Sequence, residues 1–206
     1  DFGPLKLHGS LASKERPKII KGIIGNALKF STGDSVDLSE HLPAISQLDS
    51  FTFSTWVCDP KAPLAMVFSL SGPSEQNRIQ LFLSPAYIRY GWQDGAHFDS
   101  ISGRIDGWKP DQWYHVAVTV KAGVARLYRN GRLIGLGSAG SKIGTPVLSP
   151  SLVKNPSYLL LGRLEDGHQG EKVTSQNFAG KLDDVRIYAG ALRQNAIRDL
   201  YQNHAR

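Results

Sequence analysis

One stretch near the middle of the chain carries the side chains that sugar recognition requires. It reads Tyr90-Gly-Trp-Gln-Asp-Gly-Ala-His-Phe-Asp99. A flat aromatic ring can cover the apolar face of a pyranose, and planar polar side chains can pair with its hydroxyls. We therefore expect a ligand loop here, in which one ring stacks on the sugar and the polar residues bind its hydroxyls: Trp92, Gln93, Asp94, His97 and Asp99.

The same residues also fit a structural role. Trp92 can pack in a core, and Asp94-Gly95 is an ordinary hairpin turn. A second candidate ligand loop, Arg163-Leu-Glu-Asp-Gly-His168, comes directly after an apolar segment. Both loops therefore also have a purely structural interpretation. In that interpretation the first loop supplies a core side chain and a hairpin turn.

The acidic and nucleophilic residues are poorly arranged for hydrolysis. Glycoside hydrolysis uses two carboxylates, about 5–10 Å apart, on either side of the scissile bond. Glu165 and Asp166 are adjacent, so on a strand they would point to opposite faces. The chain has no Gly-x-Ser-x-Gly motif, and its six histidines form no zinc-binding pattern. The single cysteine, Cys58, lies in an apolar stretch and is predicted to be buried and inert. The sequence predicts a protein that is not an enzyme.

Positive charge is concentrated in one part of the chain. The formal net charge is +6 at pH 7. Residues 101–150 hold only two acids, Asp106 and Asp111, against seven cations: Arg104, Lys109, Lys121, Arg126, Arg129, Arg132 and Lys142. A basic face favours acidic partners such as sulfated or uronic polysaccharides, although a solvated basic surface is the alternative. We expect no nucleic-acid partner, because no binding motif accompanies the charge.

The pattern of apolar residues predicts many strands and one helix. Short apolar segments alternate with clusters of Gly, Pro, Asn, Asp and Ser, and Asn130-Gly131 is typical of a two-residue hairpin turn. Leu192–Asn203 has apolar residues at helical spacing. The predicted strands are Ala27–Ser31, Ser35–Leu38, Phe51–Cys58, Ala65–Ser71, Arg78–Ser84, Tyr87–Gln93, His97–Ser102, Trp113–Lys121, Val124–Arg129, Arg132–Gly137, Tyr158–Leu164 and Gly180–Tyr188.

The length of the chain fits one large β domain over residues 1–206. No run of about 18 apolar residues is present, so we expect no membrane span. The opening Asp1-Phe-Gly-Pro indicates a processed product or an excised domain. The long stretch from Gly135 to Pro156 is expected to wrap the sandwich or cover one of its edges.

Several segments, in their order and spacing, resemble the laminin-G-like domains of the concanavalin A-like lectin/glucanase superfamily. The resemblance implies an all-β fold, a two-sheet antiparallel jelly-roll sandwich with a short C-terminal helix. Two positions depart from the family pattern: Arg129 stands where an apolar residue is usual, and Arg193 where a helix N-cap is usual. The matching segments are Gly25–Phe30, Gly33–Leu38, Phe51–Val57, Gln112–Thr119, Leu159–Arg163 and Phe178–Tyr188.

The resemblance also implies a structural calcium ion at a sheet edge. Calcium takes six to eight oxygen ligands, both carboxylates and backbone carbonyls. Carried over to this chain, the ligands would be the Asp183 carboxylate, the Gly33 carbonyl and, as a second carboxylate, Asp34. The alternative is that both aspartates accept hydrogen bonds from turn amides without a metal. The Glu-x-Asp-x-(x)-Glu pattern of the family's glucanases is missing.

Taken together, the residues and the resemblance predict a non-catalytic carbohydrate-binding module. Its ligand would be a polysaccharide or glycan, and an acidic ligand is one form of this hypothesis. We expect it to belong to a larger secreted, periplasmic or cell-surface protein. A protein-interaction or structural module is the alternative, and a glycoside hydrolase or lyase is the least favoured hypothesis.

Overall fold

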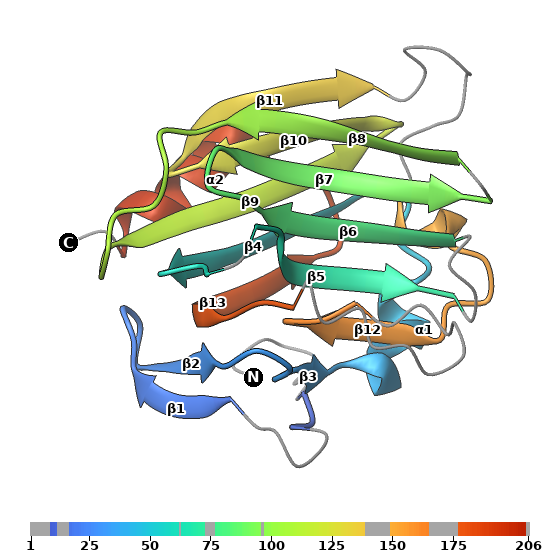
Figure 1. Cartoon of the computed structure of the whole chain (residues 1–206). Coiled ribbons are helices and arrows are strands. Elements are labelled where there is room, and N and C mark those ends of the chain that lie inside the picture. The colour runs from blue at the N-terminus through green and yellow to red at the C-terminus, as the bar shows by residue number, and fades with distance from the viewer. Residues whose placement is uncertain are drawn as a thin grey trace.

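The chain folds into two antiparallel β-sheets that pack face to face (Figure 1). The computed structural model describes residues 9–11, 17–61, 63–72, 77–95, 97–138, 149–164 and 177–204. The order of strands is β1-β2-β13-β4-β9-β10-β11 in the seven-stranded sheet and β3-β12-β5-β6-β7-β8 in the six-stranded sheet. Every pairing between these strands is antiparallel. The predicted all-β sandwich is confirmed.

The strands are β1 (Lys18–Lys21), β2 (Asn26–Phe30), β3 (Val36–Asp37), β4 (Phe51–Cys58), β5 (Ala65–Ser71), β6 (Asn77–Leu83), β7 (Tyr87–Asp94), β8 (His97–Arg104), β9 (Trp113–Lys121), β10 (Val124–Arg129), β11 (Arg132–Ser138), β12 (Tyr158–Leu161) and β13 (Gly180–Tyr188). The helical segments are η1 (Ser39–His41), α1 (Leu42–Ile45), η2 (Pro150–Leu152) and α2 (Gln194–Gln202). β4, β5, β9, β10 and β13 have the predicted ends, and the other predicted strands are confirmed with ends shifted by one to three residues.

One described strand, β1, has no counterpart among the predicted strands. It is a short edge strand with a lysine at each end, and Ile19 between them is 67% exposed. Lysines are common on edge strands because they discourage pairing with another chain. The polar ends hide the alternation by which a strand is otherwise recognised. Among the described residues, no helix has both the length and the apolar character that crossing a membrane requires.

The hydrophobic core lies between the two sheets. Alternate residues of each strand face inward, as the period of two requires. Ile79, Leu81 and Leu83 of β6 are each fully buried on this inner face. Phe53 of β4 meets Phe68 of β5 across the core, with ring centroids 4.7 Å apart. The middle strands of both sheets are therefore held by direct contact between aromatic rings.

Helix α2 covers part of the outer face of the seven-stranded sheet. Ile197 is buried against Ala117 and Tyr128, and the Tyr201 ring lies 5.7 Å from the Trp56 ring. Arg193, the residue before the helix, makes no side-chain cap, as its type predicts. The helix forms nonetheless, because its apolar stripe is buried by the sheet. The predicted C-terminal helix is confirmed, starting at Gln194 instead of Leu192.

At one edge the two sheets approach closely through glycines. A Cβ on Gly103 of β8 would lie 2.7 Å from the Ile134 side chain of β11. A Cβ on Gly135 would lie 3.0 Å from the carbonyl oxygen of Ser102. Only residues without a Cβ permit this approach. As a result, the end of β8 lies beside the start of β11. Of the predicted connection from Gly135 to Pro156, residues 139–148 lie outside the described part of the chain.

This contact makes a prediction about stability. Gly103→Ala should lower the free energy of unfolding by about 1–3 kcal/mol, because the added methyl overpacks the edge. Urea unfolding monitored by tryptophan fluorescence measures the loss. Ser102→Ala, at an exposed position of the same strand, is the control and should be close to neutral. Equal stability of Gly103→Ala and the wild type would show that the edge is not tightly packed.

Candidate functional site

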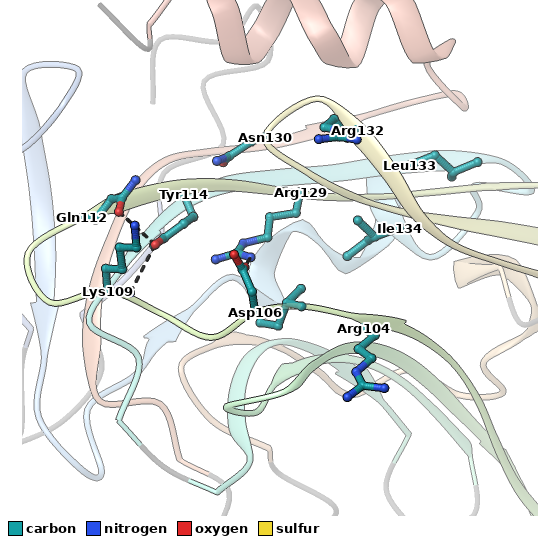
Figure 2. A pocket seen from close by; sticks show the side chains of 11 residues that line it. Arg104, Asp106, Lys109, Gln112, Tyr114, Arg129, Asn130, Arg132, Leu133 and Ile134 are labelled. Carbon is teal, nitrogen blue, oxygen red and sulfur yellow. Dashed lines mark hydrogen bonds and ion pairs between the residues drawn. The ribbon is translucent and has the colours of Figure 1, made fainter.

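A basic groove lies where β8 and β11 meet, between the β8–β9 loop and the β10–β11 hairpin (Figure 2). Its volume is about 740 Å³, within the range of small-molecule sites. We call it the basic groove, because four of the seven cations in residues 101–150 line it together with one acid. Its polar lining consists chiefly of Arg104, Asp106, Lys109, Arg129, Asn130 and Arg132.

The hairpin on one side of the groove is fixed at its tip. Asn130 and Gly131 have φ angles of 50° and 73°, as the predicted two-residue turn requires. The Asn130 backbone N–H donates to the His115 carbonyl at 2.8 Å, and the His115 N–H donates to Asn130 Oδ1 at 2.9 Å. A Cβ on Gly131 would lie 3.0 Å from Arg198 Cα of α2. The turn is therefore held by both β9 and α2.

Arg129 is bound tightly in the floor of the groove. Its guanidinium lies over two aromatic rings, 4.1 Å from the centroid of Tyr114 and 5.0 Å from that of Trp108. It also donates to the Asp106 carboxylate and, at 2.5 Å, to the Gly107 carbonyl. The charge of the Arg129 guanidinium is thus engaged by groups of the protein itself, through cation–π contacts and hydrogen bonds. The unexpected arginine of the sequence is explained: it joins β10 to the β8–β9 loop.

The β8–β9 loop has further supports that hold Lys109 at the rim. Trp108 Nε1 donates to the Ser84 carbonyl at 2.9 Å, and the Lys109 backbone N–H donates to the Tyr114 hydroxyl at 3.2 Å. That hydroxyl donates in turn to Gln112 Oε1 at 3.0 Å. The loop is therefore tied at several points along its length. The side chain of Lys109 remains exposed to solvent.

Three cations of the groove keep their charge available. Arg104, Lys109 and Arg132 are exposed, and within the described part of the chain their side chains make no hydrogen bond or ion pair. Asp106, the one carboxylate among the described lining residues, is already bound to Arg129. The hydrogen bond from Arg129 lowers the pKa of Asp106 below its ordinary value. The groove is therefore an electropositive site suited to an anion.

The Arg129 contact can be tested by titration. In Arg129→Met the pKa of Asp106 should rise toward its ordinary value, measured by NMR. The lowered pKa means that Asp106 contributes stability above its unfolded pKa, and that this contribution is lost as pH falls through the folded pKa. Lys109→Met is the matched control and should have the smaller effect, because Lys109 acts only through space. Equal shifts in the two variants would contradict the hydrogen-bonded arrangement.

The structure places the predicted ligand loop at the β7–β8 hairpin and corrects the role of Trp92. That ring points into the core and is only 2% exposed, so it presents no face to a sugar. Gln93 Nε2 donates to the Gly95 carbonyl at 3.1 Å, and Asp99 Oδ1 accepts from the Ser100 N–H at 2.7 Å. The first bond supports the turn, as in the structural alternative, and the second is a local bond within β8. Asp94 and His97 pair through their backbones, and their side chains lie outside the described part.

The exposed ring of this hairpin is Phe98, which is 45% exposed and was missing from the predicted set. The register explains the difference, because Gln93 pairs with Phe98 and Trp92 pairs with Asp99. Residues directly opposite each other in a strand pair lie on the same face of the sheet. Phe98 therefore lies on the outer face with Gln93, and Trp92 lies on the inner face with Asp99. Of the second predicted loop, Arg163 and Leu164 are described, whereas residues 165–168 lie outside the described part.

The predicted calcium ligands are not brought together. Asp183 faces the turn before β2: its Oδ2 accepts from the backbone N–H groups of Ile23 and Ile24, at 2.7 and 2.9 Å. Its Oδ1 accepts from the Asp184 N–H at 2.7 Å. Gly33 and Asp34 lie in the turn after β2, where Asp34 Oδ2 accepts from the Ser31 N–H at 2.6 Å.

Strand β2 therefore separates the two aspartates by on the order of 15 Å. Oxygens bound to one calcium ion lie within about 5 Å of each other, because each is about 2.4 Å from the ion. This set does not fit one ion. Both carboxylates instead hold turn amides, as in the metal-free alternative, and calcium binding by this chain stays a prediction.

Asp183 offers a test of both possibilities. Asp183→Ala should destabilise the fold by about 3 kcal/mol, because three part-buried backbone amides lose a charged acceptor. Thermal melts in calcium and in EDTA should show the same loss, since it comes from hydrogen bonds. Asp199→Ala, an exposed carboxylate on α2, is the control. A calcium-dependent rise of the wild-type midpoint that disappears in Asp183→Ala would instead support the metal.

A second cluster of polar groups lies at the end of β4. The Cys58 thiol, Asp59 and Asp111 have ligand atoms within 4.8 Å of one another. However, Lys181 Nζ lies among them and donates to Asp59 at 2.8 Å and to Asp111 at 2.9 Å. Burial raises the pKa of Cys58 to about 11, with Asp59 adding to the effect. The thiol is therefore protonated at neutral pH, and the predicted buried cysteine is confirmed.

Comparison with known proteins establishes the class. Residues 30–198 match the family model Laminin_G_3, the concanavalin A-like lectin/glucanases superfamily. The chain belongs to this superfamily. The CBM40 of Ruminococcus gnavus IT-sialidase, bound to α2,3-sialyllactose, is similar in structure: the TM-score is 0.72 over 85% of this chain and 96% of that one, at 13% identity. The same domain bound to α2,6-sialyllactose gives the same values.

Two further proteins match a smaller part of this chain. A heptameric SAP-like pentraxin from Limulus polyphemus has a TM-score of 0.55 and 20% identity, over 75% of this chain and 70% of that one. Adhesion G-protein coupled receptor V1 of Danio rerio is 28% identical over 96 residues, which are 47% of this chain and 1% of the receptor. The structural likenesses are below 25% identity and show the fold alone. The chain spans only a very small part of the receptor.

Proposed function

We propose that this chain is a non-catalytic module that binds an acidic glycan in the basic groove. The observation that carries the proposal is the set of exposed cations around the groove, Arg104, Lys109 and Arg132, whose charge no described side chain neutralises. Acidic sugars carry a carboxylate or sulfate, which an arginine fork or an ammonium binds through charge-assisted hydrogen bonds. The groove has room for such a group together with part of its ring.

The two sides of the groove would divide the recognition between them. On the hairpin, Arg132 offers the charged donors, and the Asn130 amide N–H₂ makes no hydrogen bond within the described part of the chain. On the loop, Lys109 adds a second charge. An amide beside two cations can pair with a sugar hydroxyl while the cations bind the acid group. Because the turn and the loop are fixed, little ordering is needed on binding.

The groove lacks the arrangement for glycoside hydrolysis. The reaction needs one protonated and one ionised carboxyl group across the bond. Among the described lining residues Asp106 is the single carboxylate, and Arg129 lowers its pKa and occupies it. A carboxyl group with a lowered pKa is ionised at neutral pH and cannot serve as the general acid. These observations support binding without catalysis.

Family and fold neighbours agree with this proposal. The superfamily includes lectins, and the CBM40 domain of similar fold is bound to sialyllactose, an acidic trisaccharide. We place the module in a secreted, periplasmic or cell-surface protein, beside other domains, because such glycans occur outside cells. A protein-interaction or structural role is the alternative. The exposed large apolar residues of the described part give it little support, because they are spread over five elements: Ile19 on β1, Tyr87 on β7, Phe98 on β8, Leu133 and Leu136 on β11, and Leu152 on η2.

Calorimetric titration with acidic and neutral sugars tests the proposal. The panel pairs 3′-sialyllactose with lactose, galacturonic acid with galactose, and heparin disaccharides with a desulfated form. At least one acidic member should bind and its neutral partner should not. Arg132→Gln and Lys109→Gln should each weaken binding about tenfold, as expected for the loss of one charge-assisted hydrogen bond.

Lys121→Gln is the matched control, because Lys121 is an exposed cation at the end of β9 outside the groove lining. It should bind like the wild type. Equal binding of neutral and acidic sugars, or an equal loss in Lys121→Gln, would overturn the proposal. A panel without any binding would also overturn it and would favour a protein partner.

A further inference from the structure

The outer face of the six-stranded sheet carries a second set of exposed groups beside the basic groove. Along β7 and β8, alternate residues point away from the core, and the register pairs Tyr87 with Arg104 and Gln93 with Phe98. Arg89 lies between these pairs on β7. We call Tyr87, Arg89, Phe98 and Arg104 the outer strip. In Figure 1 these strands belong to the front sheet, whose outer face is turned toward the viewer.

The strip has an aromatic ring at each end. Tyr87 is 36% exposed and Phe98 is 45% exposed. Phe98 lies over Gly91: a Cβ on that glycine would be 3.0 Å from the Phe98 ring. The missing side chain at Gly91 therefore lets the Phe98 ring lie down along the sheet. A ring in this position offers its free face to solvent, where the apolar face of a sugar can cover it.

The charges of the strip are all positive. The Arg89 guanidinium lies 5.5 Å from the centroid of the Tyr87 ring, and neither Arg89 nor Arg104 has an ion-pair partner within the described part of the chain. Among the described side chains of β7 and β8, those that face outward include no carboxylate: they are Tyr87, Arg89, Gln93, Phe98, Ser100, Ser102 and Arg104. A face with arginines, rings and hydroxyls but no acid is complementary to an anionic sugar chain.

Arg104 joins the strip to the basic groove. It lines the groove and at the same time faces Tyr87 across the strand pair. Figure 2 shows its side chain pointing away from Arg129 and Asp106. From Arg104 to Phe98 the strip follows β8 for about 20 Å, at about 3.4 Å per residue. This length is several times the width of one sugar ring.

We infer that the ligand is a chain of acidic sugars, which places one residue in the basic groove and continues along the outer strip. This inference rests on the proposed function of the groove and extends it from a single acidic sugar to a polyanionic polysaccharide. Arg104 and Arg89 bind successive acid groups, and Tyr87 and Phe98 support the rings between them. Recognition of this kind contacts the sugar chain along its length.

The test compares chain lengths. The probes are α2,8-linked oligosialic acids and oligogalacturonates of one to six residues, with cellohexaose as the neutral chain, titrated by calorimetry. For one acidic series, affinity should rise by about tenfold or more from monomer to hexamer, as added contacts accumulate. Arg89→Gln and Phe98→Ala should each reduce the hexamer affinity by about threefold or more and leave the monomer affinity unchanged. Arg132→Gln should weaken both.

Two controls separate this inference from the proposed function. Leu152→Ala removes an exposed apolar side chain on η2, and Lys121→Gln removes an exposed cation outside the strip; both should bind hexamers normally. The inference is wrong if a hexamer binds no better than its monomer, or if the rise of affinity with chain length persists in Phe98→Ala and Arg89→Gln. Either result leaves the proposed function of the groove standing. If Arg132→Gln binds like the wild type, the proposed binding in the basic groove is wrong. A rise of affinity with chain length that is lost in Phe98→Ala still supports binding along the outer strip.

Discussion

The close approach of β8 and β11 is the constraint on which the candidate site depends. Two layers of strands do not normally touch along an edge, because side chains keep them apart. Here Gly103 and Gly135 remove the Cβ atoms at the point of contact. The end of one sheet then lies against the beginning of a hairpin in the other, and residues 104–112 face residues 129–134. A local feature of the backbone thereby creates a surface that neither sheet has alone.

The arginines at this edge have different functions that their residue type does not reveal. Arg129 is half-buried between two rings and bound to an acid, so it serves as a structural brace. Arg132, three residues further along the chain, is exposed beside it and has no described partner. The brace neutralises the one described carboxylate of the lining, and thus leaves the net charge of the groove positive. The free positive charge of the groove follows from this difference between Arg129 and Arg132.

Strand positions were largely predictable from sequence, whereas the site was only partly so. Alternating apolar residues and Asn130-Gly131 are local signals, and they define β10 and β11 correctly. The face on which Trp92 lies depends on the inward side of β7, and both sides of that strand carry rings. Phe98 becomes the exposed ring only through its pairing with Gln93. The charge of residues 101–150 was visible, but its assembly into a groove required a contact between distant segments.

The hydrogen bonds of Lys181 affect how the domain responds to a change of pH. Its ammonium group joins β13 to the end of β4 and, through Asp111, to the β8–β9 loop. The hydrogen bonds that Lys181 donates to these two carboxylates raise its pKa above the ordinary value, so the link stays charged in neutral and alkaline solution. The link between β13, the end of β4 and the β8–β9 loop therefore persists over this range, so a change of pH there leaves one wall of the groove anchored.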